Sequence, residues 1–119
     1  MVELIVFLEP LFALFMAHLI GDYLLQNDWM ALNKKSSTFH CSVHIITYMI
    51  PFVFMPISLL GFILIAIQHF VVDRTNIIYN FMVWKGQDKF VEPPCFPWSI
   101  IVMDNISHIV WIWVVYLLF

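Results

Sequence analysis

Charged side chains are scarce in this sequence. Only 11% of its 119 residues are Asp, Glu, Lys or Arg, whereas 63% are hydrophobic. Soluble domains contain about half apolar and about a quarter charged residues, and a chain this small could not bury so much apolar surface away from water. The composition therefore predicts a single domain whose solvent is largely lipid.

Basic clusters, cysteine motifs and a signal sequence are also missing. The Lys and Arg residues form no run and the formal net charge is −3, which excludes the electrostatic footprint of a nucleic-acid-binding protein. Cys41 and Cys95 form no C-x-x-C pair, so neither a zinc knuckle nor a redox pair is expected. Glu3 and Glu9 stand where a secretory signal carries positive charge, so we expect no cleaved signal.

Long apolar runs are present instead. The sequence has four apolar blocks, and each can cross or nearly cross a hydrocarbon core of about 30 Å at about 1.5 Å per residue. Strands are not expected, because an open sheet would expose unpaired backbone groups to lipid. We predict an all-α membrane protein with four transmembrane helices in an up-down-up-down bundle, forming a single integral membrane domain over residues 1–119. The predicted helices cover about 4–26, 39–55, 57–81 and 97–119.

The basic residues are distributed unevenly, and this distribution predicts an orientation. Loops that stay in the cytoplasm are enriched in Lys and Arg. All the basic residues lie in or beside the connectors that follow the first and third blocks. We therefore predict that these connectors are cytoplasmic and that both termini are non-cytoplasmic. The residues are Lys34, Lys35, Arg74, Lys85 and Lys89.

Polar side chains inside the blocks recur four residues apart, which places them on one face of each helix. In an antiparallel bundle the four sets fall at one depth, in the cytoplasmic half of the membrane. Gly21 in the first block is expected to permit the close approach of a neighbouring helix. The sets are His18, Asp22 and Gln26 in the first block, His40 and His44 in the second, His69 and Asp73 in the third, and Asp104 and His108 in the fourth.

These polar sets predict a metal site. An ionisable side chain in lipid costs roughly 2.5–3.5 kcal/mol, so the carboxylates must be paired, protonated or coordinated. Imidazole and carboxylate bind zinc, iron and manganese, and helix bundles build two-metal sites from such ligands. A network of hydrogen bonds and ion pairs, or a proton pathway, stays open as another interpretation. We predict one or two divalent transition metal ions held by His18, Asp22, His44, His69, Asp73, Asp104 and His108, with Gln26 in a supporting role and His40 outside the site.

The same blocks resemble a known family. "AHLIGDYLLQNDWMALNKKSS", "HIITYMIPF", "IQHFVVDR" and "MDNISHIVW" are similar, in this order, to the blocks of a bacterial and phage multi-pass membrane family catalogued as domain of unknown function 3307. The resemblance implies a bacterial inner membrane location and makes a phage origin plausible, and it names no reaction. Gln68 and Asn105 stand where the family usually has Ser and Gln, and His40 is an addition. Position by position, the resemblance marks His18, Gly21, Asp22, Gln26, His44, His69, Asp73, Asp104 and His108.

Site chemistry and location suggest a reaction class. A metal that lowers the pKa of a water, beside a carboxylate base, supports hydrolysis. Proximity to the head groups then indicates a membrane lipid or an isoprenoid phosphate as substrate. We predict a metal-dependent hydrolase with Asp22 or Asp73 as the base. An oxidative reaction at two metal ions stays open, because imidazole and carboxylate also suit iron.

Two functions from other classes are alternatives. One is a non-catalytic phage membrane factor, of the holin-like or superinfection-immunity type, that acts through a membrane protein partner. The other is a small proton or ion conductor built as a homo-oligomer. The outer half of each block is nearly free of ionisable groups, and this disfavours the conductor.

Overall fold

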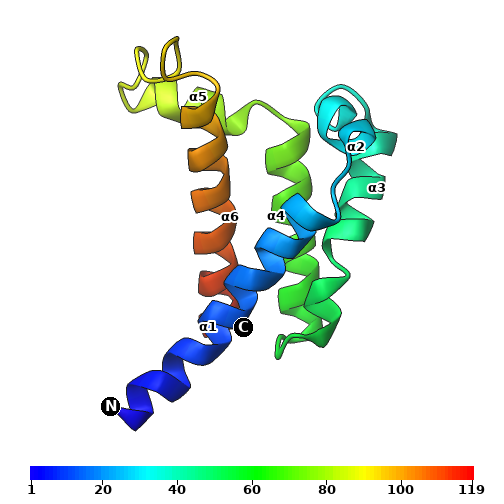
Figure 1. The fold of residues 1–119 in the computed structure, drawn as a ribbon, viewed down its shortest axis with the longest axis vertical. Helices are drawn as coiled ribbons and strands as arrows, with labels where there is room; N and C mark the ends of the chain where they lie inside the picture. The colour runs from blue at the N-terminus through cyan, green and yellow to red at the C-terminus, as the bar shows by residue number, and fades with distance from the viewer.

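The computed structural model describes residues 1–119, and all of its regular elements are helices (Figure 1). α3, α4 and α6 stand roughly side by side, α1 crosses them at an angle, and α2 and α5 lie at the end away from the N-terminus. In chain order the elements are α1 (Val2–Leu19), the π-helical turn η1 (Ile20–Leu24), α2 (Asp28–Asn33), α3 (Thr38–Tyr48), the 3-10 helix η2 (Pro51–Phe54), α4 (Leu59–Arg74), α5 (Ile77–Trp84) and α6 (Trp98–Leu118).

Two segments are long and apolar enough to cross a membrane. They are Val2–Leu24, with a mean hydropathy of 2.1, and Trp98–Leu118, with a mean hydropathy of 1.7. α3 with η2 is shorter, and α4 and α5 together are long enough only as a bent pair. The structure thus confirms the all-α class and two candidate spans, while the bundle of four spanning helices stays a prediction.

The third apolar block forms two helices, not the single helix predicted at 57–81. α4 ends at Arg74, and α5 leaves it at an angle of 76°. The break falls at a polar run in the sequence, residues 73–76. There the Lys35 ammonium donates to the backbone carbonyls of Val72, Asp73 and Thr75 at 3.3, 3.3 and 2.7 Å. The last carbonyls of a helix need partners from outside it, and a cation is the favourable one.

The other predicted boundaries shift for local reasons. The second block is α-helical only to Tyr48, because Pro51 lacks an N–H and opens the 3-10 helix η2. The first connector is not a plain loop, since it contains α2. The Asn27 side chain caps this helix by accepting a hydrogen bond from the Met30 N–H at 3.0 Å.

The core joins α1, α3, α4 and α6 below the polar layer. Its centre includes Leu14, Tyr48, Ile65 and Ile112, all 1% exposed or less. Two tryptophans, which need hydrogen-bond partners when they lie among apolar groups, connect these helices. Trp111 and Trp113 donate their indole N–H groups to Leu64 O and Leu11 O, each at 3.0 Å, so α6 is joined to both α4 and α1.

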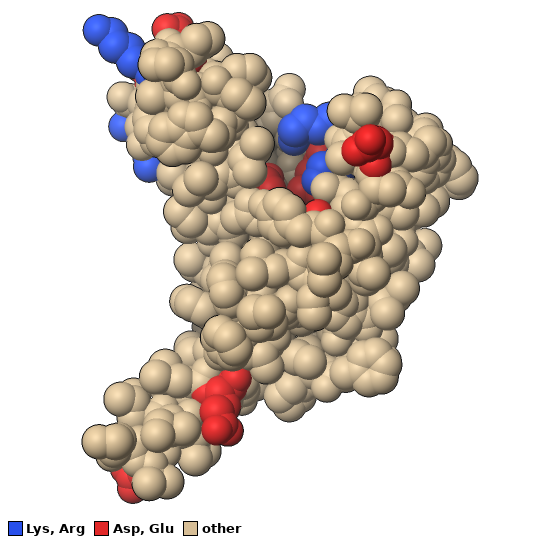
Figure 2. Space-filling view, viewed as in Figure 1, with Lys and Arg blue, Asp and Glu red and all other residues tan.

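Charge is segregated between the two ends of the molecule. The Lys and Arg side chains visible in Figure 2 lie at the end that holds α2 and α5, and acidic side chains of α1 lie near the N-terminus at the other end. Large apolar side chains such as Val6, Phe7 and Phe12 are exposed along α1. An apolar belt with charge confined to its ends is typical of a membrane protein.

Candidate metal centre

Buried ionisable side chains gather where η1, α3, α4 and α6 meet. His44 and His69 are fully buried, Asp73 is 1% exposed and Asp22 is 5% exposed. Asp104, on α6, is half-buried. Buried charges are costly unless they are paired or coordinate a metal. The contacts among these five residues therefore decide what the site can do.

Four of the side chains converge with one ligand atom each, and we call Asp22, His44, His69 and Asp73 the tetrahedral group. Asp22 Oδ1 lies 3.2 Å from the Nε2 atoms of both histidines, which are 3.2 Å from each other. Asp73 Oδ2 lies 3.0 Å from His44 Nε2 and 3.1 Å from His69 Nε2. An ion bonded at about 2.0–2.2 Å sets tetrahedral ligand atoms roughly 3.3–3.6 Å apart, so these atoms have nearly that spacing.

Hydrogen bonds alone account for these contacts poorly. In neutral His44 and His69, each Nε2 atom carries at most one hydrogen and can donate only one hydrogen bond. Each of these nitrogens nevertheless lies close to both carboxylates and to the other nitrogen. The contact between the two nitrogens is favourable only if one is unprotonated or a cation lies between them. Asp22 Oδ1 is buried and accepts no hydrogen bond. The donor set and the spacing therefore fit a bound metal ion.

A second group shares one of these carboxylates. Asp22, Asp104 and His108 offer ligand atoms within 4.8 Å of one another, and we call them the His108 group. His108 Nε2 lies 3.3 Å from Asp104 Oδ2 and 3.3 Å from Asp73 Oδ1. His108 Nδ1–H donates to Gln68 Oε1 at 3.0 Å, so Nε2 is the ring nitrogen that faces the carboxylates.

His18, a predicted ligand, lies beside the two groups and belongs to neither. The Tyr48 hydroxyl donates to His18 Nδ1 at 2.8 Å, and His18 Nε2–H donates to Asn105 Oδ1 at 2.9 Å. The Asp22 carboxylate is farther away, with Oδ2 3.7 Å from Nε2. Both nitrogens of a neutral His18 thus have hydrogen-bond partners in the structure.

Gln26 and His40 lie at the edge of the site. Gln26 Nε2 donates to the backbone carbonyl of Asp22 at 3.1 Å, so it supports the backbone of a ligand and not its carboxylate. The His40 ring lies against Trp29, with centroids 4.1 Å apart, and its Nδ1 is 2.7 Å from Ser37 Oγ. The structure therefore leaves His40 outside both groups, as the sequence predicted.

The contacts that hold the histidines in place, from Tyr48, Gln68 and Asn105, were not predicted from the sequence. Tyr48 could have been found, because it follows His44 by four residues and lies on the same face of α3. Gln68 and Asn105 are next in sequence to predicted ligands, and helical spacing assigns such neighbours to another face. Both contact a histidine on a different helix, which only the tertiary structure reveals.

The π-helical turn η1 places Asp22 in the site. The Leu25 N–H bonds to Ile20 O at 3.0 Å, five residues back, so the turn holds one more residue than an α-helical turn. A Cβ atom on Gly21 would lie 2.5 Å from Tyr48 Cδ2 and 2.8 Å from the Tyr48 carbonyl oxygen. The close approach predicted at Gly21 is therefore confirmed, and it brings η1 against α3.

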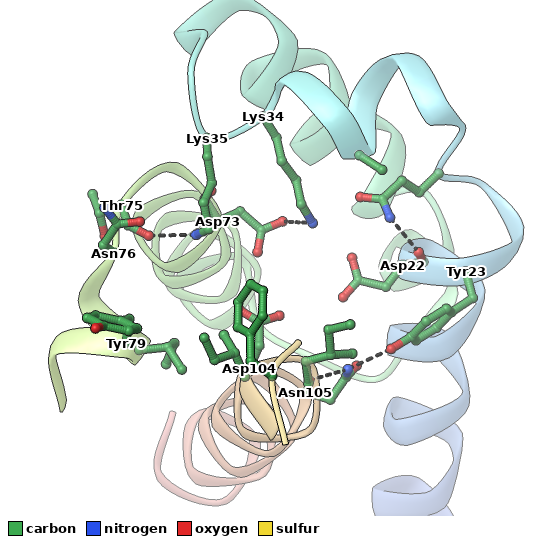
Figure 3. Close-up of a pocket in the computed structure, with 16 residues that line it drawn as sticks. Asp22, Tyr23, Lys34, Lys35, Asp73, Thr75, Asn76, Tyr79, Asp104 and Asn105 are labelled. Atoms are coloured by element: carbon green, nitrogen blue, oxygen red, sulfur yellow. Dashed lines mark hydrogen bonds and ion pairs between the residues drawn. The ribbon is translucent and has the colours of Figure 1, made fainter. Parts of the chain in front are cut away.

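A cavity of about 710 Å³ opens on the carboxylate side of the site (Figure 3). Asp22, Asp73 and Asp104 line it, and Lys34 and Lys35 reach in from the side opposite Asp104. Figure 2 shows basic and acidic side chains close together in the hollow between α2 and α5. The remaining wall, from α5, α6 and the loop between them, is largely apolar and includes Ile78, Tyr79, Phe96, Ile100 and Ile101.

Lys34 is the cation nearest to the buried carboxylates. Its Nζ lies 2.8 Å from Asp73 Oδ2, and its side chain is 18% exposed. Burial lowers the pKa of Lys34, but the negative charges of Asp73 and Asp22 outweigh that effect, so the pKa is raised. The ammonium therefore stays charged at neutral pH and faces the cavity. This contact was not predicted from the sequence, because 39 residues separate Lys34 from Asp73.

Comparison with known proteins assigns the family and nothing more specific. No curated protein and no solved structure matches the chain. One family description, "Protein of unknown function (DUF3307)", matches residues 10–119, which include every residue of both groups. The match agrees with the resemblance noted in the sequence. The chain belongs to the DUF3307 family, whose description names no function.

Proposed function

We propose that this chain is an integral membrane metalloprotein that hydrolyses a phosphate ester of a membrane lipid or isoprenoid. The observation that carries the proposal is the tetrahedral group. Its four ligand atoms come from η1, α3 and α4, with contacts of 3.0–3.2 Å around one point. Two imidazoles and two carboxylates at this spacing suit one divalent ion.

The proposed membrane arrangement uses all four apolar blocks. α1 with η1 and α6 are the two full-length spans, and α3 with η2 and α4 with α5 complete an up-down-up-down bundle. α2 and α5 lie at the end that carries the basic residues, which supports a cytoplasmic location for this end and the opposite location for both termini. The metal centre then lies in the cytoplasmic half of a bacterial inner membrane.

The cavity supports a substrate with a charged head and an apolar body. Lys34 offers a cation beside the carboxylates, and the wall from α5 and α6 offers apolar contacts such as Ile78 and Ile101. A bound divalent ion lowers the pKa of a water and polarises a phosphoryl oxygen. Asp22 and Asp73, the two predicted bases, would each place one oxygen on the ion, and the other oxygen of either carboxylate would act as the base at the cavity wall. Lys34 holds the negative head in place.

Elemental analysis of the detergent-purified chain tests the metal. We expect at least one equivalent of zinc, iron or manganese in the wild type. His69→Ala removes a ligand of the tetrahedral group and should lose that ion, whereas His40→Ala is a matched histidine control outside both groups and should retain it. A folded wild type that binds no transition metal, even after incubation with each of the three, overturns the proposal.

Phosphate release tests the reaction. Phosphatidate and an isoprenyl monophosphate in mixed micelles represent the two substrate sources, and either should yield inorganic phosphate in a metal-dependent way. Asp22→Asn keeps the size of the side chain and removes its charge, so we expect a loss of at least about a hundredfold in rate. A metal-loaded protein that releases phosphate from neither substrate contradicts the hydrolase part of the proposal and favours a non-catalytic role.

A further inference from the structure

We infer that the His108 group is a second metal site and that the centre is binuclear, with Asp22 and Asp73 shared between two ions. This inference rests on the proposed function, because it places a second ion beside the one in the tetrahedral group. It draws on contacts that the tetrahedral group does not use. They involve the second oxygen of Asp73, the stacking of two histidines, and the half-buried carboxylate of Asp104.

The Asp73 carboxylate faces both groups, one with each oxygen. Oδ2 lies 3.0 Å and 3.1 Å from the Nε2 atoms of His44 and His69, whereas Oδ1 lies 3.3 Å from His108 Nε2. A carboxylate with each oxygen among a different set of nitrogen ligands is placed to bridge two metal ions. Asp22 belongs to both groups as well, so two carboxylates connect the two sites.

One imidazole ring in each group faces the shared Asp73 carboxylate. The rings of His69 and His108 are stacked, with planes 20° apart and centroids 3.9 Å apart. Their Nε2 atoms face opposite oxygens of the same Asp73 carboxylate, so the two nitrogens point toward the same side. Ions in two-metal sites lie roughly 3.5–4 Å apart, so two imidazoles stacked at 3.9 Å can each supply a nitrogen to one of two such ions.

The second site is open toward the cavity. Its ligand atoms are His108 Nε2 and Asp104 Oδ2, 3.3 Å apart, with Asp73 Oδ1 also 3.3 Å from the imidazole and Asp22 completing the group. Asp104 is 22% exposed at its side chain and lines the cavity. A metal site with protein ligands on one side and a cavity on the other has room for water or substrate, which structural sites lack.

Charge balance indicates what enters that position. Asp22, Asp73 and Asp104 carry three negative charges, and Lys34 and Lys35 carry two positive charges. One divalent ion therefore leaves one positive charge at the cavity, and a second raises the excess to three. A phosphate monoester carries about −1.5 to −2 charges at neutral pH, so it offsets at least half of that excess. A binuclear centre thus favours the phosphate-ester substrate class.

Manganese loading of the whole chain in detergent tests this inference. We expect two Mn²⁺ per chain by elemental analysis and an exchange-coupled electron paramagnetic resonance spectrum in the wild type. Asp104→Asn changes a ligand that only the His108 group uses, and should reduce the stoichiometry from two to one and abolish the coupling. Asp88→Asn replaces an exposed carboxylate outside the site and should keep two coupled ions.

The outcomes separate this inference from the proposed function. A wild type with one uncoupled ion overturns the second site and leaves the metalloprotein proposal intact. A wild type with none overturns both. An Asp104→Asn variant that keeps two coupled ions contradicts the assignment of Asp104. If this variant does not fold, the spectrum of the wild type decides the question by itself.

Discussion

Lys34 and Asp73 form an ion pair at the boundary between the cavity and the buried metal centre, with Nζ 2.8 Å from Oδ2. The lysine comes from the end of α2 and the aspartate from the last turn of α4, so the pair also holds α2 over the site. One ammonium has three N–H donors, and this contact uses one of them. The others are available to an anion in the cavity.

Replacement of Lys34 should therefore weaken anion binding. We expect Lys34→Gln to reduce the affinity of the metal-loaded protein for inorganic phosphate about tenfold, or about 1.4 kcal/mol, because a charge-assisted hydrogen bond is lost. Isothermal titration in detergent measures this effect. Lys85→Gln, on an exposed lysine next to Phe81, is the control. Equal affinities for the wild type and the Lys34 variant would remove Lys34 from the binding site.

Lys35 should affect stability instead. Its ammonium bonds to three carbonyls at the end of α4, and Lys35→Met would leave them without their partner. We expect a loss of about 1 kcal/mol or somewhat more, visible as a lower melting temperature in detergent. Lys89→Met, on an exposed lysine in the loop before α6, should melt like the wild type. An unchanged melting temperature for Lys35→Met would show that other groups terminate α4.

A side chain at Gly21 should disturb the site directly. Gly21→Ala would place a methyl group 2.8 Å from the Tyr48 carbonyl oxygen, and backbone cannot move aside as a flexible side chain can. We expect a destabilisation of about 1–3 kcal/mol and weaker metal binding, since η1 carries Asp22. Thermal unfolding and metal titration measure the two effects.

Gly61 provides the matched glycine for this experiment. A Cβ there would meet the Ser58 hydroxyl and a Val115 methyl group at 3.2 Å, which are side-chain atoms that can adjust. Gly61→Ala should therefore be milder than Gly21→Ala and should leave metal binding unchanged. If the two variants behave alike, the close approach of η1 to α3 has no special importance for the site.

His18 should support the centre without binding the metal. In His18→Ala, the Tyr48 hydroxyl and the Asn105 amide lose their shared partner, which costs about 1–3 kcal/mol. We expect a lower melting temperature and an unchanged number of metal ions per chain. His69→Ala, in contrast, should lose metal. A folded His18→Ala protein with fewer ions than the wild type would place His18 among the ligands.

The two cysteines allow the orientation to be measured. Cys41 is fully buried, whereas Cys95 is half-exposed in the loop before α6, at the end predicted to be cytoplasmic. A membrane-impermeant maleimide added to intact bacterial spheroplasts should not label the chain, and should label Cys95 after permeabilisation. Cys95→Ser should then abolish labelling. Labelling of Cys95 in intact spheroplasts would contradict the proposed orientation.

The site was more predictable from the sequence than the fold. Asp22, His44, His69 and Asp73 were found because polar residues among apolar ones, repeated every four positions, have little reason to occur except on a shared face. Their convergence followed from one further assumption, that successive helices run antiparallel. Spacing along a helix and depth in the membrane are local properties that sequence encodes directly.

What the sequence could not show depends on contacts between distant segments. The block at residues 57–81 was predicted as one helix although the polar run at 73–76 interrupts its apolar pattern, and the hydrogen bonds that Lys35 makes at the break come from another segment. Residue spacing predicted His18 and His69 equally as metal ligands. Only the hydrogen bonds of His18 to the Tyr48 hydroxyl and the Asn105 amide distinguish the two histidines. Helical periodicity contains no information about such partners.

The origin of the ligands in separate segments has a consequence for biogenesis. Asp22 and Asp73 lie 51 positions apart in the chain and on different helices, with His44 between them in sequence. In the proposed assignment, no pair of neighbouring helices supplies all the ligands of the site. The ion can therefore bind only after α4 has been inserted, and its binding cannot start the insertion of α4. Once bound, the ion would be a cross-link that closes a long chain loop.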